Sequence, residues 1–333
     1  MFDGASILIT GGTGSFGKKY TETLLSNYKP KKIIIFSRDE LKQLEMQQSL
    51  SSTCIRYFLG DVRDADRLIQ ACNKVDYIIH AAALKQVPAA EYNPMECIKT
   101  NVNGAENIIN AAIHNKVKKV IALSTDKAAS PINLYGATKL CSDKLFVAAN
   151  NMVGANTPRF SVVRYGNVLG SRGSVVPIFK SLIEKGESEL PITDEQMTRF
   201  WITLQEGVDL VLESFRRMYG GEIFVPKIPS VRIVDVARAM APAMHLKHVG
   251  IRPGEKLHET MVPSDDSYRT IEFADHYVIT PSIRFADTEV DYRINKLGER
   301  GMDCNPGFSY DSGTNSRFLS VDEIRAMHIG AEQ

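Results

Sequence analysis

Two short segments carry side chains that can move protons. The segment Ser124-Thr125-Asp126-Lys127 joins an acid to an amine, and Tyr135 and Lys139 follow it four residues apart. On a helix this spacing puts Tyr135 and Lys139 on one face, where the ammonium lowers the pKa of the phenol and makes Tyr135 a general base. Asp126 and Lys127 indicate a second proton transfer, such as elimination or epimerisation, beside an oxidation. A lone Tyr-x-x-x-Lys pair is more often an exposed helix face, so the surrounding elements must decide.

The beginning of the chain has the pattern of a phosphate site. An apolar run at 6–10 leads into Gly11-Gly12-Thr13-Gly14-Ser15-Phe16-Gly17 and then into a helical stretch through Leu25. Gly11, Gly14 and Gly17 permit a tight turn, close approach of backbone to a pyrophosphate, and close packing of helix on strand. Because the loop lies between a strand and a helix, we predict a dinucleotide site at a helix N-terminus, with Thr13, Ser15 and Phe16 in the same loop.

The second strand, 32–36, ends in Ser37-Arg38-Asp39. An acid at the strand tip would accept a hydrogen bond from the ribose 2′-hydroxyl of NAD, whereas Ser37 and Arg38 suit the 2′-phosphate of NADP. Lys42 adds a second cation. We therefore predict NADP as the cofactor, with NAD as the alternative because Asp39 is close enough in sequence to reach a ribose.

Three further strands are expected to bring residues to the same edge of a sheet. The segment 56–62 predicts a third strand that ends in Asp61, an acid suited to the adenine amino group, and Val62. The segment 75–83 predicts a fourth, whose small residues from Ala81 onward let the backbone lie near a cofactor. A fifth, at 119–123, delivers Ser124 and the residues after it to its carboxyl end, where open α/β sheets bind ligands.

Strands alternate with helices through about residue 170, which predicts an α/β fold with a doubly wound parallel sheet. Beyond this point the pattern is less regular. A helical stretch at 204–218 and a strand at 222–225 are expected to return to the main domain. We therefore predict an NADP-binding domain of residues 1–170 plus about 204–226, and a smaller substrate-binding lobe of 171–203 and 227–333.

Bulk properties favour a cytoplasmic enzyme. The 333 residues carry a net charge of +1 and are 44% hydrophobic, which supplies a core but no basic footprint for nucleic acid. No run of about 18 apolar residues and no secretory signal is present, so no membrane partner is expected. The five cysteines are scattered without a Cys-x-x-Cys pair, which predicts reduced thiols and no metal site. His80 ends an apolar strand and is expected to be packed or hydrogen-bonded.

Eight ordered motifs give the chain a family resemblance. It resembles the extended short-chain dehydrogenase/reductases, and within them the soluble UDP-N-acetylglucosamine 4,6-dehydratases that invert C5. Where C5-retaining relatives resemble Thr-Asp-Glu, this chain has Thr125-Asp126-Lys127, and it keeps Tyr135, which larger membrane-anchored relatives often lack. The motifs lie at 11–17, 37–42, 60–64, 80–83, 124–128, 135–139, 164–168 and 252–256.

The resemblance implies a substrate site for a nucleoside diphosphate sugar. Arg199 and Arg252 are the implied partners of the diphosphate, since planar guanidinium groups suit phosphates. Glu255 is placed to accept from uracil or ribose, and Asn167 to contact the diphosphate. Lys85 is implied near the sugar or the cofactor ribose.

The resemblance also implies a reaction. Tyr135 takes the C4 hydroxyl proton as hydride leaves C4 for the cofactor, Lys127 takes the C5 proton, and Asp126 donates to the departing C6 hydroxyl. For Lys127 to be a base its pKa must fall, and we expect Lys139 and the nicotinamide to lower it. The cofactor is regenerated in each turnover.

The biological setting is implied by the resemblance alone. It is the first step of pseudaminic acid biosynthesis for flagellin glycosylation, in a homo-oligomer built on dimers, with a hexamer as one arrangement. The alternatives are a nucleotide-sugar 4-epimerase or reductase of the same fold, a dehydratase of capsule or lipopolysaccharide sugar synthesis, and a catalytically silent NADP-binding regulator.

Overall fold

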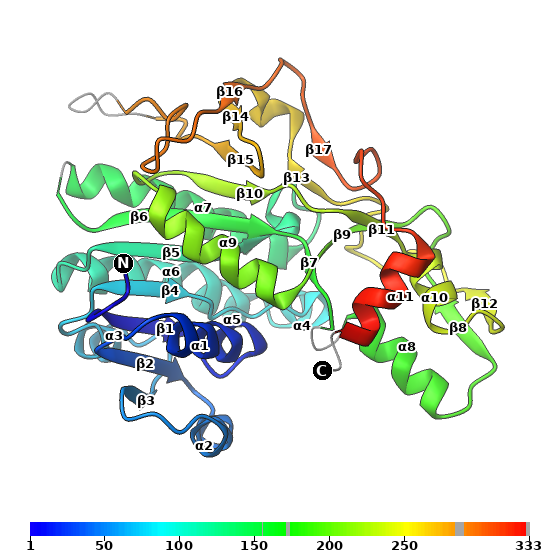
Figure 1. The fold of residues 1–333 in the computed structure, drawn as a ribbon, viewed down its shortest axis with the longest axis horizontal. Helices are drawn as coiled ribbons and strands as arrows, with labels where there is room; N and C mark the ends of the chain where they lie inside the picture. The colour runs from blue at the N-terminus through cyan, green and yellow to red at the C-terminus, as the bar shows by residue number, and fades with distance from the viewer. Residues whose placement is uncertain (155, 171–173, 284–289, 331–333) are drawn as a thin grey trace.

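A ten-stranded sheet forms the centre of the molecule (Figure 1). The computed structural model describes residues 1–154, 156–170, 174–283 and 290–330. Strand order is β16-β14-β15-β10-β6-β5-β4-β1-β2-β3. The strands from β10 to β3 are parallel to one another, and β15, β14 and β16 are added antiparallel at one edge. The predicted doubly wound α/β fold is confirmed.

The strands of the sheet are short and apolar. They are β1 (Ser6–Thr10), β2 (Lys32–Ser37), β3 (Ile55–Leu59), β4 (Tyr77–His80), β5 (Lys119–Thr125), β6 (Arg159–Tyr165), β10 (Ile223–Pro226), β14 (Thr270–Glu272), β15 (His276–Ile279) and β16 (Met302–Asp303). The third strand ends before Gly60 and the fourth spans only four residues, so both are shorter than predicted. Glycine and small residues beyond their ends form loops at the carboxyl edge.

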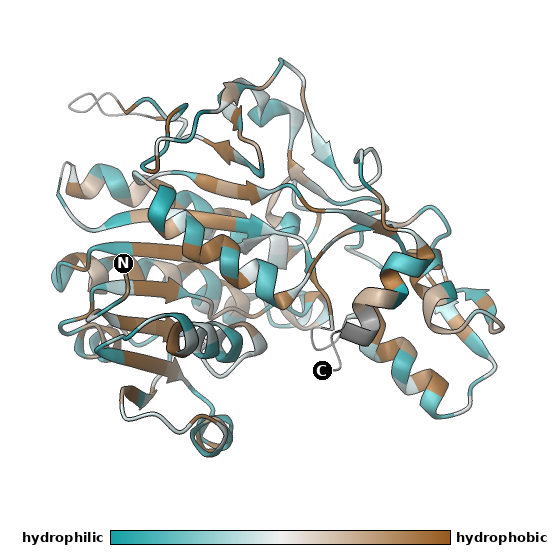
Figure 2. Cartoon of the chain, viewed as in Figure 1, coloured by the Kyte–Doolittle hydropathy of each residue, from teal (hydrophilic) through white to brown (hydrophobic). Residues whose placement is uncertain are grey.

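Helices cover both faces of the sheet, which explains why its central strands are nearly continuous runs of Ile and Val (Figure 2). The helices are α1 (Ser15–Asn27), α2 (Glu40–Ser49), α3 (Ala65–Ala71), α4 (Val87–Tyr92), α5 (Pro94–Ile98), the π-helical turn η1 (Lys99–Asn103), α6 (Gly104–His114), the 3₁₀ turn η2 (Asp126–Ala128), α7 (Leu134–Val153) and α9 (Leu204–Arg217). Helices α1 and α9 pack together, and α7 packs on α6.

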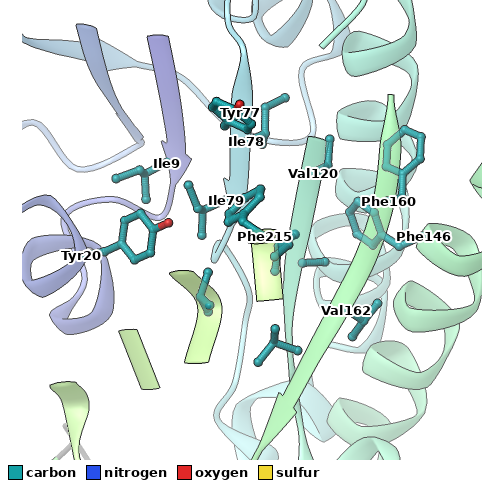
Figure 3. Close-up of a cluster of buried hydrophobic side chains, with 14 of the residues drawn as sticks. Ile9, Tyr20, Tyr77, Ile78, Ile79, Val120, Phe146, Phe160, Val162 and Phe215 are labelled. Carbon is teal, nitrogen blue, oxygen red and sulfur yellow. The ribbon is translucent and has the colours of Figure 1, made fainter. Parts of the chain in front are cut away.

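The main core lies between these layers. Figure 3 shows Tyr20 of α1 and Phe215 of α9 beside Ile79 of β4, with Phe146 of α7 and Phe160 of β6 in the same cluster. These side chains are fully buried. Burying such large apolar side chains supplies most of the driving force for folding, at about 1.5–3 kcal/mol each.

Helix α9 returns to the main domain as predicted, and its sequence explains where it begins. Thr203 accepts a hydrogen bond from the Glu206 backbone, and the Glu206 carboxylate accepts from the Thr203 backbone, which forms a capping box. Val208, Val211 and Phe215 then recur at helical spacing and are buried.

A smaller lobe is built on a second core that includes Phe179, Leu190, Trp201 and Val236. Its sheets are β11-β9-β7 and β12-β8, whereas the pair β13-β17 brings Met261, Val262 and Tyr310 to the main core. The elements outside the ten-stranded sheet and the helices named above are β7 (Asn167–Val168), α8 (Val175–Glu184), β8 (Glu189–Ile192), β9 (Thr198–Ile202), β11 (Ser230–Arg232), α10 (Ile233–Met240), β12 (His245–His248), β13 (Thr260–Val262), the 3₁₀ turn η3 (Ser264–Arg269), β17 (Tyr310–Asp311) and α11 (Val321–Gly330).

Part of the segment 227–333, expected in the smaller lobe, lies on the main sheet. Strands β14, β15 and β16 extend that sheet beyond β10, because Ile271, Tyr277 and Val278 are buried in the main core. The division into two domains stays a prediction. Within the predicted ranges, residues 155, 171–173, 284–289 and 331–333 lie outside the described residues.

Two features are absent from the described residues, a helix that could cross a membrane and a cluster of metal ligands. None of its helices combines the length and apolar character needed to cross a membrane. In the same residues, no three His, Cys, Asp or Glu side chains gather where they could hold a metal ion. The five cysteines are free thiols, two of them buried.

Candidate active site

One cavity of about 980 Å³ opens at the carboxyl ends of the parallel strands and is lined from both the main sheet and the smaller lobe. It brings together nearly all the residues predicted from the sequence. Asp61 and Asp126 are the two that do not line it. Those that do are Gly11, Thr13, Gly14, Ser15, Phe16, Gly17, Ser37, Arg38, Asp39, Lys42, Val62, Ala81, Lys85, Ser124, Lys127, Tyr135, Lys139, Asn167, Arg199, Arg252 and Glu255.

The glycine loop has the geometry of a pyrophosphate site. Gly11 has a φ of 64°, and a Cβ there would come within 2.9 Å of the Ala82 nitrogen. A Cβ on Gly17 would overlap the Gly12 backbone, so only glycine lets α1 pack this closely. Gly14 is the N-cap of α1 and offers no side chain to its first N–H groups. Those groups and the helix dipole suit an anion, so the loop fits a dinucleotide.

The residues after β2 place cations where the adenosine ribose is expected. Asp39 caps α2, accepting from the Lys42 backbone at 3.0 Å and forming an ion pair with the Lys42 amine. Its carboxylate is therefore already engaged. Arg38 is half exposed and lies 3.6 Å from Asp61. Asp61 faces Arg38 and Arg63, the latter at 2.6 Å, and its expected contact with adenine stays a prediction.

The segment after β5 forms a compact unit of an acid and an amine. Asp126 is fully buried and accepts hydrogen bonds from the Thr125 hydroxyl at 2.9 Å and from Lys127 Nζ at 3.1 Å. Lys127 faces the cavity, and a second carboxylate, Glu259, lies 3.3 Å from its Nζ. Glu259 comes from the segment just before β13. Lys127 is thus held between two carboxylates.

The predicted lowering of the Lys127 pKa is wrong for these residues. Burial acts to lower it, but Asp126 and Glu259 outweigh burial and raise the pKa well above its ordinary value. The expectation considered only Lys139 and the nicotinamide. A carboxylate distant in sequence decided the sign.

Tyr135 also differs from its predicted electrostatics. Burial raises its pKa to about 12, and Lys127 is the charge that most lowers it, with a hydrogen bond from Thr125 acting in the same direction. Lys139 donates from Nζ to the Leu123 carbonyl at 2.7 Å, and burial lowers its own pKa. The cation beside the phenol that acts most strongly is therefore Lys127, whereas we expected Lys139.

A buried network fixes α7 against the sheet. The Ser124 hydroxyl donates to Asp143 at 2.7 Å, and Arg164 Nη2 donates to the same carboxylate at 3.2 Å. Arg164 Nη1 reaches the Met261 carbonyl at 2.9 Å. Strands β5, β6 and β13 are thereby tied to the helix that carries Tyr135.

The residues implied for substrate binding have mixed surroundings. Arg199 is buried and donates to the carbonyls of Thr198 and Leu257, with its Nε 4.0 Å from Glu259. Arg252 and Glu255 pair with each other at 2.6 Å at the cavity rim. Their roles toward a ligand stay predictions.

Asn167 and Lys85, the other two residues implied for substrate binding, have polar groups at the cavity. The Oδ1 of Asn167 is buried without a hydrogen-bond partner among the described residues, which fits a ligand contact. Lys85 is exposed at the cavity, and partial desolvation lowers its pKa.

Sequence reasoning missed Glu259 and Tyr165. Tyr165 lines the cavity at the end of β6, and burial and Tyr135 raise its pKa. The rule that strand ends carry ligands would have found it. Glu259 follows the 252–256 motif by three residues, but no spacing links it to Lys127. His80 is confirmed as packed, since its Nδ1 lies 2.9 Å from the Thr10 hydroxyl and burial lowers its pKa to about 3.

Residues 7–281 match the family described as polysaccharide biosynthesis protein. The chain belongs to that family. It is 63% identical over 324 residues, 97% of both chains, to "UDP-N-acetylglucosamine 4,6-dehydratase (inverting)" of Campylobacter jejuni subsp. jejuni serotype O:23/36. It is also 45% identical to "UDP-glucose 4-epimerase" of Rickettsia canadensis, over 84% of each chain.

The fold is also that of solved structures. The X-ray structure of Pen from Bacillus thuringiensis aligns with a TM-score of 0.89 at 35% identity, covering 100% of this chain and 99% of that one. DesIV, a dTDP-glucose 4,6-dehydratase from Streptomyces venezuelae solved with NAD bound, aligns with a TM-score of 0.67 at 22% identity, over 76% of this chain and 86% of that one. The extended short-chain dehydrogenase/reductase fold is confirmed.

Proposed function

We propose that this chain is an inverting UDP-N-acetylglucosamine 4,6-dehydratase, a hydro-lyase that uses NADP. The observation that carries the proposal is the cavity that Thr125, Lys127 and Tyr135 line together with the glycine loop, with Asp126 buried beside Lys127. The 63% identity to inverting dehydratases of that name supports the substrate and the stereochemistry. Arg38, together with the engagement of Asp39 by Lys42, supports NADP over NAD.

Tyr135 removes the proton of the sugar C4 hydroxyl. A bound nicotinamide dinucleotide would accept hydride from C4 and return it at C6. Because burial raises the pKa of Tyr135 to about 12, its ionisation depends on neighbouring positive charge, which Lys127 supplies. Lys139, fixed to the Leu123 carbonyl, holds its cation on the same helix face.

Lys127 and Asp126 act on the next two bonds. The ketone at C4 acidifies the C5 proton, which Lys127 Nζ removes, and Asp126 protonates the departing C6 hydroxyl as water. The 3.1 Å contact between Asp126 and Lys127 supports this division of roles, because it holds the two groups close enough to act on adjacent carbons of one sugar. Return of a proton to C5 from the opposite face gives the L-arabino 4-keto-6-deoxy product.

We place this reaction as the first step of pseudaminic acid biosynthesis for flagellin glycosylation. The supporting fact is the stereochemistry named for the Campylobacter jejuni relative. A cytoplasmic homo-oligomer built on dimers is part of the same proposal. Capsule or lipopolysaccharide sugar synthesis is the alternative pathway for the same product.

Turnover in D₂O tests the proposal. With UDP-N-acetylglucosamine, NMR should show loss of the C6 hydroxyl, one solvent deuteron at C5, and the hydrogen of C4 transferred to C6. The first product should have the L-arabino configuration. A D-xylo product formed first would refute inversion and leave the dehydratase intact, and no turnover at all would favour the silent regulator.

A 4-epimerase is the second candidate, because the Rickettsia relatives bear that name. An epimerase uses the tyrosine but has no use for the acid and amine at 126 and 127. The same NMR experiment separates the two, since an epimerase product keeps its C6 hydroxyl and gains no deuterium at C5.

A further inference from the structure

Glu259 is the one carboxylate at the cavity wall beside Lys127 for which the reaction above has no task. Its side chain is 3% exposed, and its Oε1 lies 3.3 Å from Lys127 Nζ. Its Oε2 accepts no hydrogen bond among the described residues. A buried carboxylate with an unsatisfied oxygen is costly, so its retention at this point calls for a role.

The charges around this pair are all identified. Lys127 faces the carboxylates of Asp126 and Glu259 and the phenol of Tyr135. Glu259 additionally meets Arg199 Nε and Lys256 Nζ, each at 4.0 Å. Burial, followed by the charge of Asp126, raises the pKa of Glu259. The carboxylate therefore holds a proton more readily than an ordinary glutamate.

The proposed reaction needs a neutral amine, but the site holds an ammonium. Lys127 must lose a proton before it can remove one from C5. Asp126 is an unsuitable acceptor, because in this mechanism it has already taken a proton from solvent, before the sugar closes the cavity, and must keep that proton for the C6 hydroxyl. Solvent is also unsuitable once a sugar fills the cavity. Among the described residues, Glu259 is the other carboxylate paired with Lys127 Nζ, at 3.3 Å.

We propose that Glu259 is a positioning residue that takes the Nζ proton of Lys127, so that Lys127 meets C5 as a neutral amine. This inference rests on the proposed function. An N–H bond of Lys127 breaks and an O–H bond forms at Oε1, with no change in net charge and no redox partner. Conversion of a buried ion pair to a neutral pair is favoured as substrate removes water from the cavity.

The same contacts return Lys127, Asp126 and Glu259 to the protonation states that they had before the reaction. After the C5 proton has moved to Lys127, Asp126 is ionised and Glu259 is protonated. Lys127 lies 3.1 Å from the first carboxylate and 3.3 Å from the second. It can therefore pass a proton to Asp126 and take one from Glu259, which restores the starting state.

The test compares Glu259→Gln with the wild type. Two steps are followed separately: C4 oxidation, by the absorbance of reduced nicotinamide, and C5 deprotonation, by deuterium uptake from D₂O. In the variant we expect C4 oxidation to persist and C5 deuteration at neutral pH to fall about 100-fold or more. Glu272→Gln is the matched control, because Glu272 also pairs with a lysine, Lys227 at 2.7 Å, but neither residue lines the cavity.

The pH profile separates this role from a merely structural one. In the wild type the proton moves within the pair, so C5 deuteration should be nearly flat around neutral pH. In Glu259→Gln the Lys127 ammonium must instead lose its proton to solvent. The rate should therefore rise about tenfold per pH unit below the Lys127 pKa. Glu259→Asp keeps a carboxylate and should restore most of the flat profile, with a lower rate because the carboxylate is one methylene further from Nζ.

Three outcomes overturn the inference. One is unchanged C5 deuteration in Glu259→Gln, and the second is loss of C4 oxidation in parallel with it, which would mean that Glu259 serves binding or folding. The third is a steep pH profile in Glu259→Asp, which decides the question even where Glu259→Gln does not fold. If the wild type itself fails to act on the sugar nucleotide, the proposed function falls first.

Discussion

Lys127 shows how far a side chain's properties depend on neighbours that sequence spacing does not reveal. Its position after β5 was predicted from strand ends, and the structure confirms that it faces the cavity. Its protonation was predicted with the wrong sign, because Glu259 approaches from the segment before β13. Local patterns identified the segment 124–127 and Tyr135. The contact that sets the charge of Lys127 is tertiary.

Tyr135→Phe should nearly abolish hydride transfer from C4. The variant keeps the ring but loses the base, and a positioned base contributes about 100- to 10,000-fold. Single-turnover formation of reduced nicotinamide measures the step. Normal C4 oxidation in this variant would exclude Tyr135 as the base.

Lys127→Met should separate the two halves of the reaction. C4 oxidation should persist without dehydrated product, so reduced nicotinamide accumulates. Because Lys127 lowers the pKa of Tyr135, its removal raises that pKa further and should shift the pH profile of C4 oxidation upward. Dehydration at the parental rate would contradict the role given to Lys127.

Arg38→Asp should weaken NADP much more than NAD. The change removes a phosphate partner and adds repulsion, and loss of a charge-assisted hydrogen bond corresponds to about 10- to 100-fold in Kd. Calorimetric titration with each dinucleotide gives the ratio. Equal weakening of both would argue against the NADP assignment.

The corner formed by β5, η2 and α7 holds the reacting groups at fixed separation. Asn133 caps α7 by accepting from the Gly136 backbone, and Gly136 packs against the Lys127 carbonyl. Strand β5 was predictable from its apolar run, and the helix that carries Tyr135 from the four-residue spacing between Tyr135 and Lys139. The closeness of η2 to the helix was not, because it depends on a residue without a side chain at the contact.

Gly136→Ala should impair catalysis through this corner. A Cβ at 136 would overlap the Lys127 carbonyl oxygen, so η2 and α7 must move apart and Tyr135 shifts from Lys127. We expect kcat to fall by about 100-fold, because small misplacements of catalytic groups have effects of that size. Thermal unfolding monitors stability in parallel.

Gly207→Ala on α9 is the matched control. A Cβ there meets nothing within 4 Å, so the variant should keep full activity. It should gain about 0.5–1 kcal/mol of unfolding free energy, because alanine loses less backbone entropy in a helix than glycine does. Equal activity losses in Gly136→Ala and Gly207→Ala would contradict the role given to the contact between η2 and α7.

Across the molecule, the doubly wound parallel sheet was predictable and its antiparallel edge was not. Alternation of strands and helices through residue 170 indicated the doubly wound sheet. The addition of β14, β15 and β16 to that sheet rests on short antiparallel strands whose register is set by burial of Ile271 and Tyr277, which no local period marks. The second core could not be predicted for the same reason, because its buried residues come from segments that lie far apart in the sequence.

The buried pair Arg164 and Asp143 should stabilise the molecule as a whole, since Arg164 also donates to the Met261 carbonyl in β13. Arg164→Met leaves Asp143 buried without its cation and should cost about 3–5 kcal/mol of unfolding free energy, measured in urea. Arg325→Met removes an exposed pair with Asp322 and should change it by less than about 1 kcal/mol. Similar losses of unfolding free energy in Arg164→Met and Arg325→Met would mean that the buried pair contributes no more stability than the exposed one.

The placement of one amine between two carboxylates also constrains how the stereochemistry of such a site can evolve. A glutamate at position 127 would stand against Asp126 and Glu259, with only Arg199 and Lys256 near enough to compensate. We therefore expect substitutions at positions 127 and 259 to have non-additive effects. A mutational path that exchanges the lysine for an acid must pass through a change at 259 first, or through an intermediate that folds poorly.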